Sequence, residues 1–292
     1  MSTTSQTTQH KDRRTLPPLH VGRVRRREWI SADMVRIVLG GEGLARFDNP
    51  EGWTDTYVNL LFPPADAPYQ APFELDEVRE LDRALWPTPR RYTVRRWDRD
   101  TREMWIDFVI HGDEGTAGRW ARDVQPGELL QFRGPGGAYR PAPHASHHLL
   151  VGDESALPAI AAAVEEVEAG ARVTVVGLVD APDGQIPLES PGRLELHWLH
   201  RRDLATDPAD PAIAAALVTA VADLDLSSGC PDVQAFVHGE AEETRAVRRY
   251  LLGDRMLPRE RISVSPYWRR NYTDEAWRQI KQDWVRQVEQ DS

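Results

Sequence analysis

Short runs of apolar and alternating residues divide the first half of the chain. They end at Gly, Pro or Asp, and they cover residues 21–29, 34–39, 57–62, 90–97, 104–110 and 129–132. Because side chains alternate between the two faces of a strand, runs of this kind are typical of antiparallel strands. Residues 63–89 are rich in Pro and acidic residues, and we interpret them as a long excursion with a short helix near 74–85. The pattern predicts a small antiparallel Greek-key β-barrel.

A different pattern begins near residue 143, where apolar runs alternate with helical segments. We expect strands at residues 148–151, 172–179, 194–199, 234–238 and 262–267, and helices at 157–168, 211–222 and 240–252. The strand runs are almost continuously apolar, which is typical of a parallel sheet covered by helices on both faces. Apolar residues recur on one face of a last predicted helix, 273–289, for which Thr273 is a candidate N-cap. The second half is therefore predicted to be an α/β domain with a C-terminal helix.

These patterns divide the chain into three parts. We expect a disordered tail over residues 1–18, a β-barrel domain over 19–142, and an α/β domain with a C-terminal helical extension over 143–292. Ligands of such a pair of domains are expected at the carboxyl ends of the parallel strands and in the cleft between the domains.

Composition and charge limit the classes of ligand and cofactor that the chain is expected to use. The chain has 36 Lys and Arg residues against 46 Asp and Glu residues, a formal net charge of −10, so we expect no binding to nucleic acid. The one cysteine, Cys230, excludes an intramolecular disulfide and a cysteine-held iron–sulfur cluster, so redox chemistry would need a bound organic cofactor. Neither an apolar leader nor a bilayer-length run is present, which predicts a cytoplasmic protein without membrane insertion.

One predicted strand carries the sequence RRYTVR at residues 90–95. Arg90 and Tyr92 are two positions apart and share one face of the strand, which places a cation beside a flat aromatic ring. A flavin dinucleotide needs both, the ring to stack on its isoalloxazine and the charge to meet its diphosphate, and Thr93 can hydrogen-bond the flavin edge. Taken alone, the motif also fits an exposed strand whose arginines face solvent.

A second motif, HGDEGTAGRWA at residues 111–121, follows a predicted strand and opens a helical turn. Small residues at a helix start let the backbone approach a phosphate closely, and the free N–H groups there bind anions. His111 lies at the same rim. The alternative interpretation is a plain β–α connection with Thr116 as a helix cap.

A third motif, GDESALPAI at residues 152–160, follows the first strand of the α/β domain, where a dinucleotide-binding turn lies in doubly wound folds. The GxGxxG fingerprint is absent. Ser155 is a candidate helix cap with Pro158 in the first turn. On the residues alone, contact with a nicotinamide stays open.

Two further motifs, FVHGE at residues 236–240 and YWRRN at 267–271, each end a predicted parallel strand. Tyr267 and Trp268 can stack on a ring, and Arg269 and Arg270 can meet an anion. A core aromatic followed by solvated arginines is the alternative.

Metal binding, acyl transfer and phosphoryl transfer have less support in the sequence. His144, His147 and His148 have ligand-like spacing but no nearby carboxylate, and His197 and His200 would lie on opposite faces of a strand, so we predict no metal site. The chain has no GxSxG motif and no Walker loop, which leaves acyl and phosphoryl transfer without support.

Taken together and in this order, these motifs resemble the siderophore-interacting protein family of FAD-dependent ferric-siderophore reductases, within the ferredoxin-reductase-like group. The resemblance runs from about residue 21 to residue 272. RRYTVR is similar to the family's flavin signature, residues 111–120 to its second flavin segment, and residues 152–160 to its most distinctive motif, in which Thr is commoner at position 155. HGEA at 238–241 and YWR at 267–269 resemble its C-terminal pair.

The resemblance implies a reductase that passes electrons from NADPH or NADH through FAD to an Fe(III)-siderophore and releases Fe(II), with a ferredoxin as an alternative donor. It implies cofactor binding by Arg90, Arg91, Tyr92, Thr93, Asp107, Val109, His111, Thr116, Ala117, Gly118, Trp120, Gly152, Asp153, Glu154, Ser155, Ala156, Gly239, Glu240 and Trp268. It assigns no catalytic residue. The candidates for a basic rim that binds the siderophore are Arg133, Arg269 and Arg270.

Three departures from the family pattern concern geometry. Thr116 stands where Pro is common, Pro266 where Gly precedes Tyr-Trp-Arg, and Asn271 where Gly follows it. The last two bear on the path of the final strand. Two alternatives remain beside the reductase, namely a flavin-dependent reductase of another acceptor and a non-enzymatic siderophore-binding protein.

Overall fold

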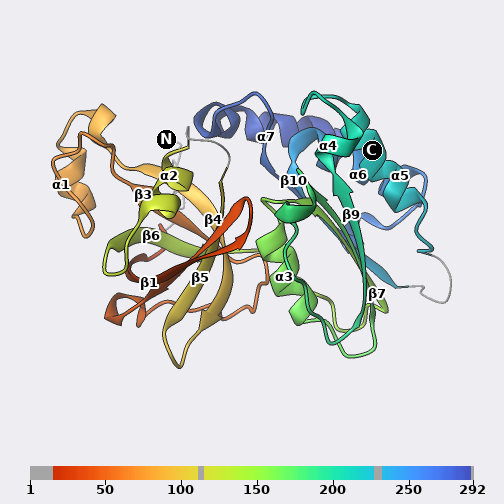
Figure 1. The fold of residues 1–292 in the computed structure, drawn as a ribbon, viewed down its shortest axis with the longest axis horizontal. Coiled ribbons are helices and arrows are strands. Elements are labelled where there is room, and N and C mark those ends of the chain that lie inside the picture. The colour runs from red at the N-terminus through yellow and green to blue at the C-terminus, as the bar shows by residue number, and fades with distance from the viewer. Residues whose placement is uncertain (1–15, 111–114, 227–231, 291–292) are drawn as a thin grey trace, which may run out of the picture.

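A computed structural model describes residues 16–110, 115–226 and 232–290 of the chain. Six antiparallel strands close into a barrel in the order β1-β2-β5-β4-β3-β6. The strands are β1 (Leu19–Ser31), β2 (Met34–Gly40), β3 (Tyr57–Phe62), β4 (Thr88–Asp98), β5 (Glu103–Val109) and β6 (Leu129–Gly136). Figure 1 shows the barrel beside a second, α/β half of the molecule. The predicted antiparallel barrel is confirmed.

The barrel core follows from alternation along its strands. Val35, Ile37 and Leu39 of β2 are fully buried in one cluster, because residues two apart point to the same face. Phe108 of β5 and Phe132 of β6 fill the same cluster. Apolar burial of this kind is the main favourable free-energy contribution to folding.

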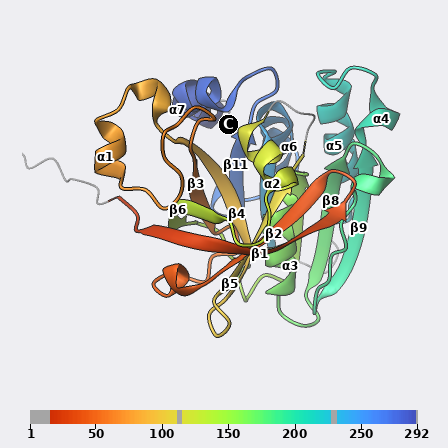
Figure 2. The ribbon, with the colours of Figure 1, turned by 60° about the vertical axis from the view of Figure 1, so that its left-hand side comes forward.

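The long excursion between β3 and β4 contains two short helical segments rather than one. α1 (Leu75–Arg79) ends before a separate 3-10 turn, Arg83–Leu85. The carboxylate of Asp82 accepts a hydrogen bond from the N–H of Ala84 at 2.9 Å, and it thereby starts the second segment. α1 lies on the side of the barrel away from the sheet (Figures 1 and 2).

The second half is a five-stranded sheet in the order β11-β10-β7-β8-β9, and every neighbouring pair is parallel. The strands are β7 (His147–Asp153), β8 (Arg172–Val179), β9 (Arg193–His200), β10 (Val233–Glu240) and β11 (Ile262–Trp268). The order reverses between β7 and β10, so this sheet has its topological switch point there. The predicted parallel α/β sheet is confirmed.

Helices cover both faces of the sheet. α3 (Leu157–Glu165) packs with Leu150 and Phe236 on one face. α5 (Ala212–Ala222) and α6 (Ala241–Gly253) pack with Leu149 and Val237 on the other. A short α4 (Arg201–Leu204) follows β9, and α2 (Thr116–Asp123) lies in the barrel half. Ser155 does not cap α3 as expected, since the N-cap is Ala156 and no side chain caps that end.

The last helix, α7 (Asp274–Gln290), joins the two halves. Trp277, Trp284 and Val288 form one buried stripe against Ala241 at the start of α6. Thr273 accepts a hydrogen bond on its hydroxyl oxygen from the N–H of Ala276 at 3.2 Å, as expected for an N-cap. α7 runs along the top of the view in Figure 1, between the barrel and α6.

The predicted domain boundary at residue 142 lies in the segment between β6, which ends at Gly136, and β7, which begins at His147. The boundary itself stays a prediction.

None of the helices in the described part of the chain combines the length and the apolar character that a bilayer span requires.

Candidate functional site

A cavity of about 1250 Å³ lies between the barrel and the sheet. Its walls come from β3, β4, β5, β10, β11 and α7, together with the turn that follows β7. Ligand pockets commonly have about 300–1,000 Å³, so this cavity has room for a large ligand such as a dinucleotide. The sequence-predicted cofactor residues that line it are Arg90, Arg91, Tyr92, Thr93, Asp107, Val109, Ser155 and Trp268.

The two arginines of β4 have different partners. Arg90 donates from Nη1 to Glu275 at 2.6 Å and to Asp274 at 3.2 Å, and both carboxylates belong to the first turn of α7. The guanidinium of Arg91 lies over the ring of Tyr57, 4.3 Å from its centroid. The barrel therefore presents one cation already paired with α7 and a second held flat on an aromatic ring.

Tyr92 is half-buried and packs on Phe108. Their ring centroids are 4.3 Å apart with an interplanar angle of 34°. Tyr92 also lines the cavity, so the protein supports the ring while the ring still borders the cavity space. Burial raises the pKa of the Tyr92 phenol above its ordinary value. The ring is therefore a neutral, flat and supported surface.

Polar side chains of the barrel and of the sheet meet at the cavity. Thr93 lies near the hydroxyl of Tyr267, which is 3.0 Å from Nδ1 of His238. Nε2 of His238 lies 3.0 Å from the hydroxyl of Ser263. Burial, and then the nearby charge of Lys281, keeps the pKa of His238 well below its usual range, so the imidazole is neutral. Tyr267, His238 and Ser263 all line the cavity.

The two predicted site residues of β5 lie side by side on the cavity wall. Asp107 accepts two hydrogen bonds from Arg36, from Nε at 2.7 Å and from Nη2 at 2.8 Å, and its side chain is fully buried. Such a bidentate pair fixes the carboxylate geometrically. Val109 is half-buried and packs against the core on the α3 face of the sheet. Both residues shape the wall without an unpaired charge.

α2 brings four predicted residues close to the barrel but not to the cavity. Ala117 is buried in the barrel core, and Trp120 packs edge-on against Phe62 with ring centroids 5.5 Å apart. Gly115 rather than Thr116 is the N-cap, and no side chain caps that end of the helix. A Cβ on Gly118 would meet the carbonyl oxygen of Val109 at 3.6 Å, an ordinary contact. His111 lies outside the described residues.

The carboxylate of Asp153 joins the ends of three parallel strands, β7, β10 and β11. Oδ1 accepts hydrogen bonds from the N–H of Ser155 at 2.9 Å and from its hydroxyl at 2.5 Å. Oδ2 accepts from the N–H of Glu240 at 2.9 Å and from Nε1 of Trp268 at 2.7 Å. This capture of the Ser155 hydroxyl explains why Ser155 does not cap α3.

Two glycines let these strand ends approach one another. Gly239 has φ of +140°, and a Cβ there would lie 2.9 Å from the Asp153 carboxylate. A Cβ on Gly152 would lie 2.6 Å from that of Ala156 and 2.7 Å from the carbonyl oxygen of His238. Both motifs therefore need glycine for packing, independently of any ligand.

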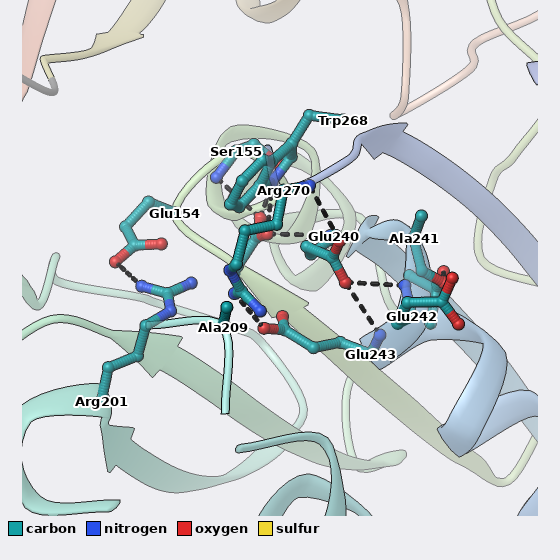
Figure 3. A network of polar contacts seen from close by, with 12 residues as sticks. Glu154, Ser155, Arg201, Ala209, Glu240, Ala241, Glu242, Glu243, Trp268 and Arg270 are labelled. Atoms are coloured by element: carbon teal, nitrogen blue, oxygen red, sulfur yellow. Dashed lines mark hydrogen bonds and ion pairs between the residues drawn. The ribbon is translucent and has the colours of Figure 1, made fainter. Parts of the chain in front are cut away.

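Further carboxylates at the same strand ends already have partners. Glu240 is the N-cap of α6 and accepts from the N–H groups of Glu242 and Glu243, while its other oxygen accepts from the N–H of Arg270 at 3.1 Å. Arg270 donates from Nη2 to Glu243 at 2.7 Å. Buried Glu154 accepts from Arg201 at 2.5 Å. Figure 3 shows this network from close by.

The three substrate candidates do not line the cavity. Arg133 on β6 donates to the carbonyl oxygen of Pro17 at 2.7 Å. Arg269 pairs with Glu242 at 3.2 Å and lies over the ring of Tyr272, and Arg270 is held by Glu243 as described above.

Cations from α7 line the cavity although the motifs did not reveal them. Arg278, Lys281 and Arg286 all face it. Their spacing along the sequence is compatible with one side of a helix, but that pattern does not reveal which surface the helix covers. Asn59 and Asp55 of the barrel half also went undetected, because they lie outside the recognised motifs.

Metal ligation finds no support among the residues that the structure describes, since no group of three or more His, Cys, Asp or Glu side chains there is arranged to hold a metal ion. His147 instead hydrogen-bonds the hydroxyl of Thr174 at 2.9 Å, and burial lowers its pKa to about 4.

Comparisons with known proteins cover both halves of the chain. Residues 23–139 match the model of the siderophore-interacting FAD-binding domain, and residues 145–271 match the siderophore-interacting protein model. A crystal structure of the siderophore-interacting protein SipS from Aeromonas hydrophila superposes with a TM-score of 0.76 at 28% identity, over 92% of this chain and 99% of that one.

Two curated relatives cover most of the chain. An uncharacterized protein of Mycobacterium tuberculosis is 39% identical over 273 residues, 91% of this chain and 95% of that protein. The ferric vibriobactin reductase ViuB of Vibrio cholerae is 34% identical over 259 residues, 86% of this chain and 90% of that protein. With both of its halves matched in order, this chain belongs to the siderophore-interacting protein family and contains that family's FAD-binding domain.

Proposed function

We propose that this chain is a ferric-siderophore reductase that holds FAD in the cavity and passes electrons from NADPH or NADH to an Fe(III)-siderophore, with release of Fe(II). The observation that carries the proposal is the β4 segment on the cavity wall, where two arginines, an aromatic ring and a hydroxyl follow one another. Family membership and the name of the ViuB relative support the same choice.

The residues of this wall fit a flavin dinucleotide. Tyr92 is supported from behind by Phe108, so a flat ring can lie against it without displacing protein. Arg90 and Arg91 supply positive charge for a diphosphate, and the Thr93 hydroxyl supplies a hydrogen-bonding group for a ring edge. Val109 and Trp268 add apolar surface on either side of the cavity.

Other predicted cofactor residues act indirectly in this proposal. The ends of β7, β10 and β11 are held together by Asp153 and Glu240, whose carboxylates already accept hydrogen bonds within the protein. Gly152 and Gly239 allow the close approach of these strand ends. The turn of Ser155 and the ring of Trp268 then stay in place at the cavity wall. Glu154 and Ala156 are buried beside them, and α2 with Thr116–Trp120 supports the barrel wall.

Bound FAD would supply the conversion of a two-electron hydride into single electrons. The chain's own part is to bind and to orient, and the electron transfer itself requires no side chain as an acid or a base. Fe(III) in a siderophore is held by hard oxygen donors, and its one-electron reduction to Fe(II) weakens those bonds, so that softer ligands compete.

An anionic ferric siderophore would meet positive charge near the cavity. Arg269 is the candidate whose pairing carboxylate, that of Glu242, is itself about half exposed, and it is therefore the most easily diverted to a ligand. Arg133 and Arg270 remain in the proposal as rim residues. The site of action would be the cytoplasm, where NADPH, NADH and reduced ferredoxin are all available as donors.

The test is anaerobic reduction. The purified protein, loaded with FAD to about one per chain, is mixed with NADPH, NADH or a reduced ferredoxin in turn, and flavin bleaching is followed. A ferric siderophore and a chelator that reports Fe(II) are then added. Donor-dependent formation of the Fe(II) chelate at a rate that requires FAD is the expected result.

Three outcomes contradict the proposal. If the purified protein binds no flavin, it has no redox role. A flavoprotein that reduces free flavin or a carrier protein but no ferric siderophore would be a reductase of another acceptor. A protein that binds a ferric siderophore without any reduction would be a binding protein.

A further inference from the structure

The sheet of the second half ends in two edge strands, β11 and β9, whereas the barrel is closed and has no edge. β11 contains Pro266, which has no N–H to donate, and it borders the cavity beside α7. β9 pairs with β8 alone, and Figure 2 shows it at the outer side of the sheet. β9 therefore has an outer edge whose backbone groups meet no further strand of the described chain.

β9 has few of the features that keep edge strands from pairing. All 8 of its residues pair with β8 without a register shift, so no bulge twists the edge away. The strand contains neither Pro nor Lys. Leu196, in the middle of the strand, is 40% exposed. A long and regular edge with an exposed apolar residue is a template for another strand.

The side chains of β9 divide between the two faces of the sheet by alternation. Leu194, Leu196 and Trp198 share the face that α3 covers, where Leu194 and Trp198 pack partly against the core. Glu195 and His197 share the opposite face, with Oε1 of Glu195 2.9 Å from Nε2 of His197. Both of these polar side chains are more than one-third exposed, at 55% and 37%. The strand thus has three apolar side chains on one face and an acidic and an imidazole side chain on the other.

This pattern suits a second copy of the same strand. When two copies run antiparallel about a two-fold axis at Leu196, Leu196 faces its own copy and Leu194 faces Trp198 of the partner subunit. On the other face, Glu195 of each copy faces His197 of the partner subunit. Apolar pairs and complementary polar pairs directly opposite each other stabilise an antiparallel pair.

The neighbouring registers fit less well. A two-fold axis at Glu195 places Glu195 opposite Glu195, and like charges directly opposite are destabilising. An axis at His197 places the two imidazoles opposite each other and Glu195 opposite Leu199. An axis between two residues places apolar side chains beside polar ones, because a shift of one residue exchanges the two faces.

We infer that two copies of this chain pair through β9, antiparallel and with Leu196 on the two-fold axis, so that one sheet continues from copy to copy. The interface is isologous, because the same strand serves on both sides. It uses no residue that lines the cavity, and it is independent of the proposed reductase. One strand pair makes a small interface, so dimerisation should depend on concentration, with a dissociation constant of about 1–100 µM.

The first test is the mass of the purified full chain in solution. Sedimentation velocity from about 1 µM to about 300 µM, with a reductant present, should show wild type passing from monomer to dimer. Leu196→Lys should raise the dissociation constant about tenfold or more, because a charge at the centre of the edge is desolvated when the strands pair.

Met256→Lys is the matched control for this test. It places the same charge on an apolar residue that is 79% exposed and lies outside the strands and helices. This variant should dimerise as wild type does.

The second test measures the register. In a Cys230→Ser background, which removes the one native cysteine, Leu196→Cys should form a disulfide-linked dimer in a glutathione redox buffer. Cα atoms directly opposite each other in an antiparallel pair are about 4.5–5.5 Å apart, within reach of a disulfide. Arg193→Cys is the control on the same strand. Arg193 faces Leu199 in this register, so its two copies lie about 20 Å apart and should stay unlinked.

Four outcomes contradict the inference. The first is a chain that stays monomeric throughout and does not cross-link through Leu196→Cys. The second is a dimer that Leu196→Lys leaves intact, since its interface would lie elsewhere. The third is cross-linking through Arg193→Cys but not through Leu196→Cys, which indicates another register. The fourth is an edge that pairs with a strand of a different protein while this chain stays monomeric.

The two tests do not depend on each other or on the reductase activity. If Leu196→Lys does not fold, the cross-linking of the Leu196→Cys variant still decides the inference. A chain that reduces a ferric siderophore as a monomer at every concentration would refute the β9 dimer and leave the proposed function intact.

Discussion

Arg90 and Glu275 lie 185 positions apart in the chain, yet Nη1 of Arg90 donates to the Glu275 carboxylate at 2.6 Å. This ion pair, with the neighbouring one to Asp274, ties the first turn of α7 to β4. The same guanidinium is the one that a flavin diphosphate would need. In the proposed function, binding of the cofactor phosphate by Arg90 would therefore compete with docking of α7 on Arg90.

The first prediction follows from this competition. The double variant Asp274→Asn, Glu275→Gln should bind FAD more tightly, by about two- to tenfold, because partly exposed ion pairs are each worth about 0.2–1 kcal/mol. Titration of apoprotein with FAD measures the change. Asp76→Asn removes an exposed carboxylate that pairs with Arg79 on α1 and does not line the cavity, and it serves as the control. Weaker binding by the double variant would show that α7 docking assists the cofactor.

Tyr92 provides the second prediction. Tyr92→Ala should weaken FAD binding about fivefold or more, because stacking on an aromatic face contributes about 1 kcal/mol. Tyr92→Phe should retain the affinity, since the ring rather than the hydroxyl is the proposed contact. Tyr92 also packs on Phe108, so thermal unfolding of both apoproteins must be compared. Normal flavin retention by folded Tyr92→Ala would remove the ring from the proposed site.

The third prediction concerns the glycine of the HGE motif. Gly239→Ala should lower the free energy of unfolding by about 1–3 kcal/mol, because the residue has positive φ and its new Cβ would meet the Asp153 carboxylate. Chemical denaturation measures the change. Gly253→Ala at the end of α6, where no atom lies within 4 Å of a new Cβ, is the matched control. Equal stability of Gly239→Ala and wild type would mean that the strand ends are not as tightly packed as described.

Glu243 gives a prediction about pH. Burial, and then the charge of Asp153, raises the pKa of its carboxyl to about 7 in spite of Arg201 and Arg270. The folded state therefore holds a proton between about pH 4.5 and 7 that the unfolded state has released. Stability from this group is present at low pH and is lost as pH rises through that window, by about 1–3 kcal/mol.

The measurement is the free energy of unfolding at pH 5 and at pH 8. Glu243→Gln cannot titrate, so relative to wild type it should gain stability as the pH rises between those values. A difference between variant and wild type that stays constant with pH would show that Glu243 is ionised throughout, held so by its ion pair with Arg270.

Much of the architecture is readable from the sequence, because strand alternation and continuous apolar runs reflect burial directly. The prediction for residues 172–179 coincides with β8, and the N-cap at Thr273 is confirmed. Ser155 shows the limit of local rules, since its hydroxyl is taken by Asp153 instead of capping α3. The competing acceptor, Asp153, lies at the end of the preceding strand. Helix propensities and capping preferences consider only the helix and so do not include it.

The candidate site was predictable where its residues lie within the recognised motifs or beside them on the same strand. Arg90–Thr93 are consecutive, so alternation along β4 indicated the juxtaposition of cation and ring. Lys281 and Trp277 reach the same cavity because α7 crosses from α6 to β4, and the apolar stripe of α7 reveals a buried face without revealing its partner. Likewise, the sequence could not reveal that Asp107 is neutralised by Arg36, since the two are 71 residues apart.

The two halves of this molecule are joined twice, once by the segment between β6 and β7 and once by α7, which packs on α6 at one end and pairs with Arg90 at the other. A ligand as large as a dinucleotide therefore enters or leaves a space that is bounded on several sides by covalent and non-covalent links. The rates at which the dinucleotide binds and leaves should consequently depend on how fast the first turn of α7 detaches from Arg90. Ionic strength, which weakens the Arg90 pairs, would then speed both association and dissociation and leave their ratio less affected than either rate.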